Sequence, residues 1–151
     1  MSIKKLIGDS MGRLYKNMSL LYAGISPKNE TSSQNLRKRI LTHYRGNAEG
    51  STLRLTLGVL LCEKSGFELR RVGSGKRKTF THLGKQWLDK WMDDNAFVVW
   101  VKNKYPWKIE NDILKHFSLP LNIQDNDHHE FSKKLSAIRT KAKKLAEKLP
   151  I

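Results

Sequence analysis

The sequence contains little cysteine and no long hydrophobic run. Its single cysteine, Cys62, excludes an internal disulfide and any zinc site built from several cysteines. The longest apolar run, from Leu55 to Cys62, is far shorter than the ~20 residues needed to span a bilayer. No apolar stretch of signal-peptide length follows the lysines of Met1–Leu6, so we expect a cytoplasmic protein that has no membrane partner.

Acidic residues are also scarce. The chain has 14 Asp and Glu against 29 Lys and Arg, which gives a formal net charge of +15. Such an excess attracts polyanions, and a nucleic-acid backbone is the commonest polyanion that a soluble protein meets. An anionic membrane surface is the rival partner, but the basic C-terminal helix has only a moderately amphipathic pattern.

The length and composition indicate one compact domain. At 151 residues, with 38% hydrophobic and 28% charged residues, the chain is long enough to bury a core and too short for two domains of ordinary size. We therefore expect a single domain over residues 1–151. The sequence leaves its oligomeric state open.

The N-terminal third predicts a hairpin followed by a helix. Short strands are expected over Arg13–Lys16 and Ser19–Ile25, with turn chemistry at Asn17. After a polar loop, Ser32 or Ser33 is expected to cap a helix that ends near Tyr44.

The middle of the chain is less regular. A loop over Gly46–Gly50 precedes leucines on one helical face, although the alternation of Leu53, Leu55 and Leu57 leaves a strand open. A basic turn over Gly73–Lys78 follows an extended segment. Thr81 opens a probable helix, whose expected inner residues are Leu83, Trp87, Leu88 and Trp91.

The C-terminal third predicts a strand and two helices. The β-branched and aromatic run Ala96–Val101 is typical of a strand covered on both faces. Pro106 is well placed to begin a helix that reaches about Phe117. A final basic helix is expected within about 129–149, with lysines outward and an inner face of Phe131, Leu135, Ile138, Ala142 and Leu145.

Several polar residues suit phosphodiester cleavage, which needs a base for water, cations for the phosphoryl oxygens, and a metal or acid for the leaving oxygen. Tyr15 and Tyr22 would lie close together on a hairpin, although strand tyrosines are more often packing residues. Arg39 and His43 share one helical face, where an arginine braces a phosphate and a histidine assists proton transfer. A solvated basic face is the alternative.

Glu110 is the candidate metal ligand. It lies in a predicted helix, and Mg²⁺ often takes only one or two protein carboxylates because it retains several waters. A surface glutamate in a helix is otherwise unremarkable, so Glu110 alone does not decide the chemistry.

The order of these residues resembles the GIY-YIG nucleases. Tyr15 and Tyr22-Ala23-Gly24 are similar to the GIY and YIG elements, and Asn35–Arg39 with His43 is similar to the helix behind them. The segment from Glu110 to Lys115, ending in Pro120-Leu121-Asn122, resembles the Glu-x-x-Leu-Ile-Lys…Pro-x-Asn segment of these nucleases. The first element reads Arg13-Leu14-Tyr15, so only its tyrosine is retained. The loop from Gly46 to Arg54 looks like that of small bacterial stand-alone members.

The resemblance implies an α+β fold with a central antiparallel sheet of three strands flanked by helices. The core would span about 12–122, with a helical insertion at about 46–95 and an extra C-terminal helix. It implies a DNA endonuclease with Mg²⁺ or Mn²⁺ and no small-molecule cofactor.

The resemblance also implies residue roles. Tyr15 or Tyr22 would be the base, Arg39 would stabilise the transition state, and His43 would assist. Glu110 would hold the metal and Asn122 would support the site. Gly24 would let the backbone pass close to the helix that carries Arg39. We expect DNA contacts from Arg37, Lys38, Arg45, Lys76, Arg77, Lys78 and Lys115. The alternative is an inactive nucleic-acid-binding protein on the same scaffold.

Overall fold

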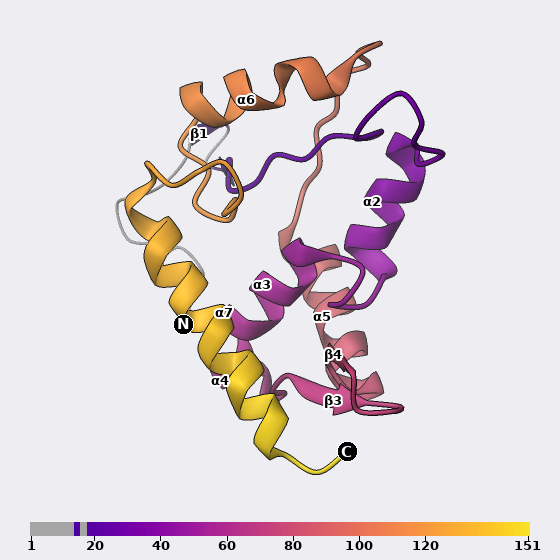
Figure 1. Cartoon of the computed structure of the whole chain (residues 1–151), viewed down its shortest axis with the longest axis vertical. Helices are drawn as coiled ribbons and strands as arrows, with labels where there is room; N and C mark the ends of the chain where they lie inside the picture. The colour runs from indigo at the N-terminus through magenta and orange to yellow at the C-terminus, as the bar shows by residue number, and fades with distance from the viewer. Residues whose placement is uncertain (1–13, 16–17) are drawn as a thin grey trace. The chain divides into compact units, whose positions relative to one another are not determined.

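The structure is a computed structural model. It describes the backbone of residues 14–15 and the backbone and side chains of residues 18–151. In this part of the chain the fold is α+β (Figure 1). The elements are, in order, β1 (Leu14–Tyr15), β2 (Met18–Ser19), α2 (Leu36–Arg45), α3 (Thr52–Leu60), α4 (Cys62–Ser65), β3 (Arg70–Val72), β4 (Arg77–Thr79), α5 (His82–Asn95), α6 (Pro106–His116) and α7 (Glu130–Lys148).

The chain divides into two compact units. Unit 1 contains Leu41–Phe97 and Ser136–Ile151, and unit 2 contains Ser2–Ile40 and Val98–Leu135. The segment 46–95, expected to be a helical insertion, lies wholly within unit 1. The helices α2 and α7 each have one part in either unit.

The expected sheet of three strands is not found among residues 14–15 and 18–151. These residues form two separate antiparallel pairs instead. In unit 2, β1 pairs with β2 through Leu14↔Ser19 and Tyr15↔Met18. In unit 1, β3 pairs with β4 in the register Arg70↔Thr79, Arg71↔Lys78 and Val72↔Arg77. The β3–β4 turn contains Gly73 and Gly75 at φ 61° and 80°, a conformation that favours glycine.

The core of unit 1 lies between α3, the β3–β4 hairpin and the C-terminal part of α7 (Figure 1). Ala146 is 0% exposed and packs with Leu55 and Val59 of α3. The predicted inner residue Leu145 is 48% exposed, so that prediction is wrong by one position. A small side chain at 146 suits close packing of the helix against the core. The remaining core residues are Ala48, Leu69 and Phe80, with Ile138 and Ala142 packed against them.

A buried arginine connects several helices of unit 1 through hydrogen bonds and an ion pair. Arg54 is 1% exposed, and its Nη2 lies 2.6 Å from the Asp89 Oδ1. Its Nη1 donates to the backbone oxygens of His43 and Tyr44 at 3.1 and 2.7 Å, in the last turn of α2. These bonds satisfy carbonyls that have no partner within their own helix. Arg54 therefore connects α3 to α5 and to the end of α2.

Side chains cap the first turns of α2 and α5, but the residue that caps α2 differs from the predicted one. Asn35, and neither Ser32 nor Ser33, caps α2, because its Oδ1 accepts a hydrogen bond from the Lys38 backbone N–H at 2.9 Å. Thr81 caps α5 as predicted, through Gly84 N–H at 3.2 Å.

The inner face of α5 differs from the prediction. Its buried residues are Gly84, Leu88 and Met92, whereas Leu83 is 63% exposed. The buried positions follow a spacing of four residues, which is helical, but the face is rotated from the one that the tryptophans indicated. Cys62, at the start of α4, is only partly buried. Residues 53–60 belong to a helix, which settles the alternative left open by the leucine alternation.

The run Ala96–Val101 is not a strand. It has no strand pairing among the described residues, and Val99 and Val101 are 82% and 86% exposed. The residue types favour an extended chain, but a strand also needs neighbouring backbone with which to pair. The following helix does begin at Pro106, as predicted.

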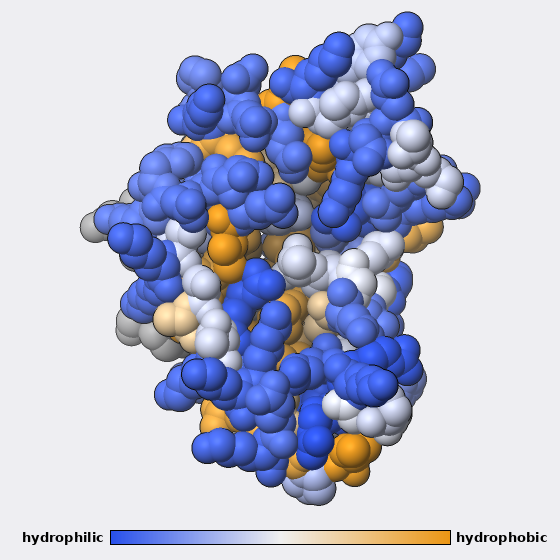
Figure 2. All heavy atoms as spheres, viewed as in Figure 1, coloured by the Kyte–Doolittle hydropathy of each residue, from blue (hydrophilic) through white to orange (hydrophobic). Residues whose placement is uncertain are grey.

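Much of the surface is hydrophilic. The face drawn in Figure 2 is coloured mainly as hydrophilic. Among the described residues, no helix is both long enough and apolar enough to cross a bilayer.

Candidate active site

Tyr22 lies in unit 2 on an extended segment between two backbone attachments. The Leu121 N–H donates to Leu21 O at 2.9 Å, just before Tyr22. After it, the Ala23 N–H donates to Asn122 Oδ1 at 3.0 Å, and Asn122 Nδ2 donates to Ala23 O at 2.8 Å. Tyr22 was expected within the second hairpin strand, but β2 ends at Ser19. Side-chain and backbone bonds to the 121–122 segment replace strand pairing there.

A second asparagine supports the first. Asn126 is 0% exposed, and its Nδ2 donates to Leu119 O and to Asn122 O at 2.9 and 3.0 Å. The sequence analysis missed Asn126, because a polar Asp-Asn-Asp run is typical of a solvated turn. Its buried bonds fix the turn that presents Asn122 to Ala23.

Arg39 approaches Tyr22 from α2. Its Nη2 donates to the Tyr22 hydroxyl at 3.4 Å, and both side chains are half-buried. The Arg39 Nε is buried and has no acceptor among the described residues. The guanidinium therefore retains hydrogen-bonding capacity beside the tyrosine hydroxyl.

Gly24 lies against the ring of Tyr22. A Cβ at Gly24 would lie 3.0 Å from Tyr22 Cε1 and 3.2 Å from its hydroxyl oxygen. We expected glycine here to let the backbone pass close to the helix of Arg39. The nearest atoms belong to Tyr22 instead, because residues two apart on an extended chain point to the same side.

Glu110 lies on α6, and the charge of Arg39 acts on its carboxyl group. Burial and then the charge of Asp125 raise the pKa of the Glu110 carboxyl, while the charges of Lys28 and Arg39 act to lower it. The structure thus brings Glu110, Arg39 and Tyr22 into one region of unit 2. Lys28 and Asp125 were not predicted, because both lie in loops without a periodic pattern.

The donor chemistry around Glu110 fits a divalent metal. Mg²⁺ prefers carboxylate oxygens and keeps several waters, so one or two carboxylates suffice. Asp125 raises the pKa of Glu110 because two like charges repel, and a bound cation would relieve that repulsion. Within the described part of the chain, no group of three or more His, Cys, Asp or Glu has the arrangement of a metal cage.

Two predicted site residues are not placed in this cluster. The side chain of Tyr15 lies outside the described residues, so its role stays a prediction. His43 belongs to unit 1, is 8% exposed, and has its Nδ1 2.8 Å from Ser51 Oγ, at the start of α3. Its predicted assistance to proton transfer also stays a prediction.

The predicted DNA contacts are distributed over both units. Arg37 and Lys38 are exposed on α2, and Lys115 is exposed on α6. Arg45 is paired with Asp93 at 2.9 Å. Lys76, Arg77 and Lys78 belong to the turn and second strand of the β3–β4 hairpin.

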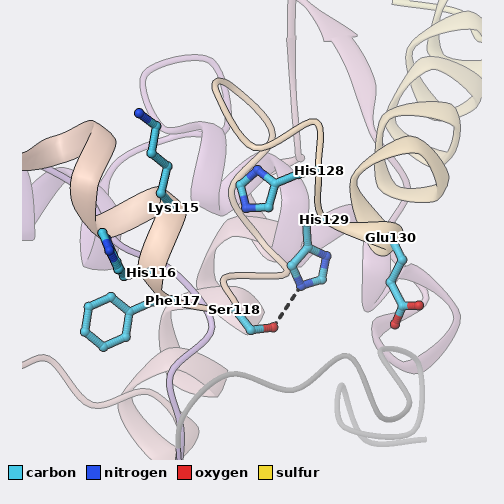
Figure 3. A pocket seen from close by; sticks show the side chains of 7 residues that line it. All are labelled: Lys115, His116, Phe117, Ser118, His128, His129 and Glu130. Carbon is cyan, nitrogen blue, oxygen red and sulfur yellow. Dashed lines mark hydrogen bonds between the residues drawn. The ribbon is translucent and has the colours of Figure 1, made fainter.

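A pocket of about 500 Å³ lies in unit 2 where α6 ends and α7 begins (Figure 3). The Phe131 N–H donates to His129 Nδ1 at 3.1 Å, and His129 Nε2 lies 3.1 Å from Ser118 Oγ. With Nδ1 accepting, a neutral His129 carries its proton on Nε2 and donates to Ser118. His129 therefore acts as a helix cap. The pocket is lined by Lys115, His116, Phe117, Ser118, His128, His129 and Glu130.

Comparison with protein families places this geometry in context. The family model described as the GIY-YIG catalytic domain matches residues 5–141, which is most of the chain. Searches among curated proteins and among solved structures give no match. The chain belongs to the GIY-YIG catalytic domain family, a family of endonucleases.

Proposed function

We propose that this protein is a metal-dependent endonuclease that hydrolyses DNA phosphodiester bonds at a single-metal site. The observation that supports this most is the contact of Arg39 Nη2 with the Tyr22 hydroxyl at 3.4 Å, together with the effect of the Arg39 charge on Glu110. Three residue types that phosphodiester cleavage needs are thereby in one part of unit 2.

Arg39 is the residue that stabilises the phosphoryl group in this proposal. A guanidinium supplies charge-assisted hydrogen bonds to phosphoryl oxygens, and these strengthen as negative charge develops. The bond from Nη2 to Tyr22 fixes the direction of the fork.

The oxygen of a tyrosine side chain positions the attacking water and, in the phenolate form left after its own proton has passed to solvent, accepts the proton of that water. Tyr22 is the candidate whose hydroxyl is described beside Arg39, and Tyr15 remains the alternative. Asn122 positions Tyr22 by binding both backbone groups of Ala23. Gly24 leaves room for the ring.

Glu110 would hold the metal, Mg²⁺ or Mn²⁺. When bound, such an ion polarises a phosphoryl oxygen and stabilises charge on the leaving oxygen. Glu110 offers a carboxylate, and the nearby negative charge of Asp125 would favour the binding of a cation there.

The proposal can be tested by plasmid nicking in Mg²⁺ or Mn²⁺. We would compare the wild type with Glu110→Gln and with a matched control, Asp112→Asn, which changes an exposed carboxylate on the same helix. The wild type and Asp112→Asn should nick supercoiled DNA only when metal is present. Glu110→Gln should bind DNA but not cut it.

Two outcomes would contradict the proposal. If the wild type binds DNA tightly yet never cuts it with either metal, the protein is the inactive binder. If Glu110→Gln nicks as fast as Asp112→Asn, Glu110 does not hold a catalytic metal.

A further inference from the structure

The charges of unit 1 are segregated. Six of its seven carboxylates form ion pairs, and these six are Glu49, Glu68, Asp89, Asp93, Asp94 and Glu147. Lys76, Lys141, Lys144 and Lys148 form no ion pair with any described residue. Most of the uncompensated positive charge of unit 1 therefore lies on the β3–β4 hairpin and the C-terminal part of α7, and Lys64 on α4 is the exception.

Three contacts fasten the hairpin to the C-terminal segment. Arg71 Nη2 donates to Leu149 O at 2.9 Å, and Arg70 Nη2 donates to Pro150 O at 3.0 Å. Lys78 Nζ lies 2.9 Å from Glu147 Oε1. These contacts connect the hairpin to the C-terminal part of α7 within unit 1, although Lys78 and Arg139 are 61 residues apart in the sequence.

The lysines of α7 lie on one outward stripe. Lys141, Lys144 and Lys148 are spaced by three and four residues, which places them on one helical face, and all three are exposed. The core residues Ala142 and Ala146 lie on another face. Seven residues of helix rise about 10.5 Å, so the stripe can meet successive phosphates of a strand, which advance roughly 3.4 Å each along a duplex axis.

We propose that Lys141, Lys144 and Lys148, with Lys76 and Arg77 at the hairpin, form a docking surface for the phosphodiester backbone of duplex DNA. We call these five residues the basic surface. It lies on unit 1, whereas Tyr22, Arg39 and Glu110 lie on unit 2. The partner follows from the proposed function, and the role is to hold substrate while the other residues cut it.

The composition of the basic surface favours a backbone over the rival polyanions. Its lysines are point charges that bind phosphates without reading base edges. A membrane-binding helix would also present a broad apolar face to the lipid, but the exposed part of α7 offers Leu145 as its large apolar residue beside the lysine stripe. We therefore expect DNA affinity that does not depend on sequence.

The test measures binding of a labelled duplex by fluorescence anisotropy, with EDTA present and the salt concentration varied. The variant Lys141→Gln/Lys144→Gln/Lys148→Gln is compared with Lys64→Gln/Lys90→Gln/Lys102→Gln, which removes three exposed lysines elsewhere. Each lost phosphate contact should reduce the salt slope by about 0.9, so the first variant should lose about 2 to 3 and the control less than about 1. Anionic phospholipid vesicles serve as the second probe.

Equal losses of affinity in the two variants would overturn the proposal, because binding would then follow total charge. Vesicle binding that depends on the α7 lysines, with DNA binding unchanged, would assign the surface to a membrane instead. Nicking by the wild type in Mg²⁺ or Mn²⁺ is scored separately. If the wild type never nicks DNA but the salt slope is smaller in the α7 variant than in the wild type, the nuclease proposal is wrong and the proposed docking surface is supported.

Discussion

The arginines of the two units contrast most clearly. In unit 1, Arg54 is fully buried, and its two Nη atoms bond to Asp89 and to backbone oxygens of α2 and α5, although its Nε has no acceptor among the described residues. In unit 2, Arg39 contacts the Tyr22 hydroxyl while its buried Nε has no acceptor among the described residues. The difference between the two arginines is the ion pair with Asp89, which ties the guanidinium of Arg54 to the fold of unit 1. Unit 1 uses its arginine to hold the fold, and unit 2 keeps one available.

Of the changes that test this contrast between the two arginines, removal of Arg39 should have the largest effect on function. Arg39→Ala is expected to slow plasmid nicking about 10²–10³-fold, the usual result of losing one donor that stabilises developing charge. The melting temperature should barely change, since Arg39 forms no ion pair with the residues that the structure describes. Arg37→Ala, two positions earlier and exposed, serves as the control and should keep the rate at saturating DNA.

Breaking the Arg54 pair should instead reduce stability. Asp89→Ala leaves a buried guanidinium without its carboxylate, and we expect a loss of about 2–3 kcal/mol in the free energy of unfolding, discounted because Asp89 is partly exposed. Urea denaturation measures this. Asp94→Ala, which breaks an exposed pair with Lys90, should cost less than about 1 kcal/mol. Equal losses in the two variants would show that Arg54 is not a structural clamp.

The same pair predicts a pH dependence. Burial acts to raise the pKa of Asp89, but the hydrogen bond from Lys85 and the charge and hydrogen bond of Arg54 outweigh it, so the pKa lies below its usual value. A lowered folded-state pKa stabilises the protein above the unfolded value of about 3.9, and this contribution is lost as the pH falls through the folded value. Asp89→Asn should flatten the stability profile in that acidic window, measured by denaturation at several pH values.

Asn122→Ala tests the positioning of Tyr22. The variant loses two hydrogen bonds to Ala23, each worth about 1 kcal/mol, so nicking at saturating DNA should fall by at most about 30-fold. DNA affinity should stay near the wild-type value. An unchanged rate in a folded variant would show that the Ala23 attachment does not position the tyrosine.

Gly24→Ala should have the smallest effect, a reduction of a few-fold in the nicking rate. The added methyl would lie 3.0 Å from the Tyr22 ring and push it from Arg39. Gly50→Ala is the control, because its Cβ would meet Asn47 Oδ1 at 3.4 Å and Thr42 Cγ2 at 3.9 Å, which are ordinary contact distances. If both variants nick equally well, the close approach at Gly24 does not matter for activity.

Local patterns in the sequence predicted the helices well. Pro106 begins α6, Thr81 caps α5, and the spacing of Phe131, Leu135 and Ile138 gives α7. Predictions that depend on long-range neighbours were less accurate. The run 96–101 has strand residues but no pairing partner in the described part of the chain, and Ala146 replaces Leu145 inside because the core there admits a small side chain.

The residues of the candidate site also fall into two groups, those to which the sequence pointed and those that depend on tertiary contacts. The resemblance to GIY-YIG nucleases pointed to Arg39 and Glu110, and in the structure Arg39 bonds to the Tyr22 hydroxyl while its charge acts on Glu110. Lys28, Asp125 and Asn126 come from loops, whose paths depend on tertiary hydrogen bonds and leave no periodic signal.

The most direct test of the central claim is a double-mutant cycle on single-turnover nicking with Tyr22→Phe and Arg39→Ala. If the hydroxyl and the guanidinium act as one cleavage device, the double variant should be no slower than the slower single variant. If the two losses multiply, or if the wild type does not nick at all in Mg²⁺ or Mn²⁺, the contact between Arg39 and Tyr22 is not part of a nuclease site.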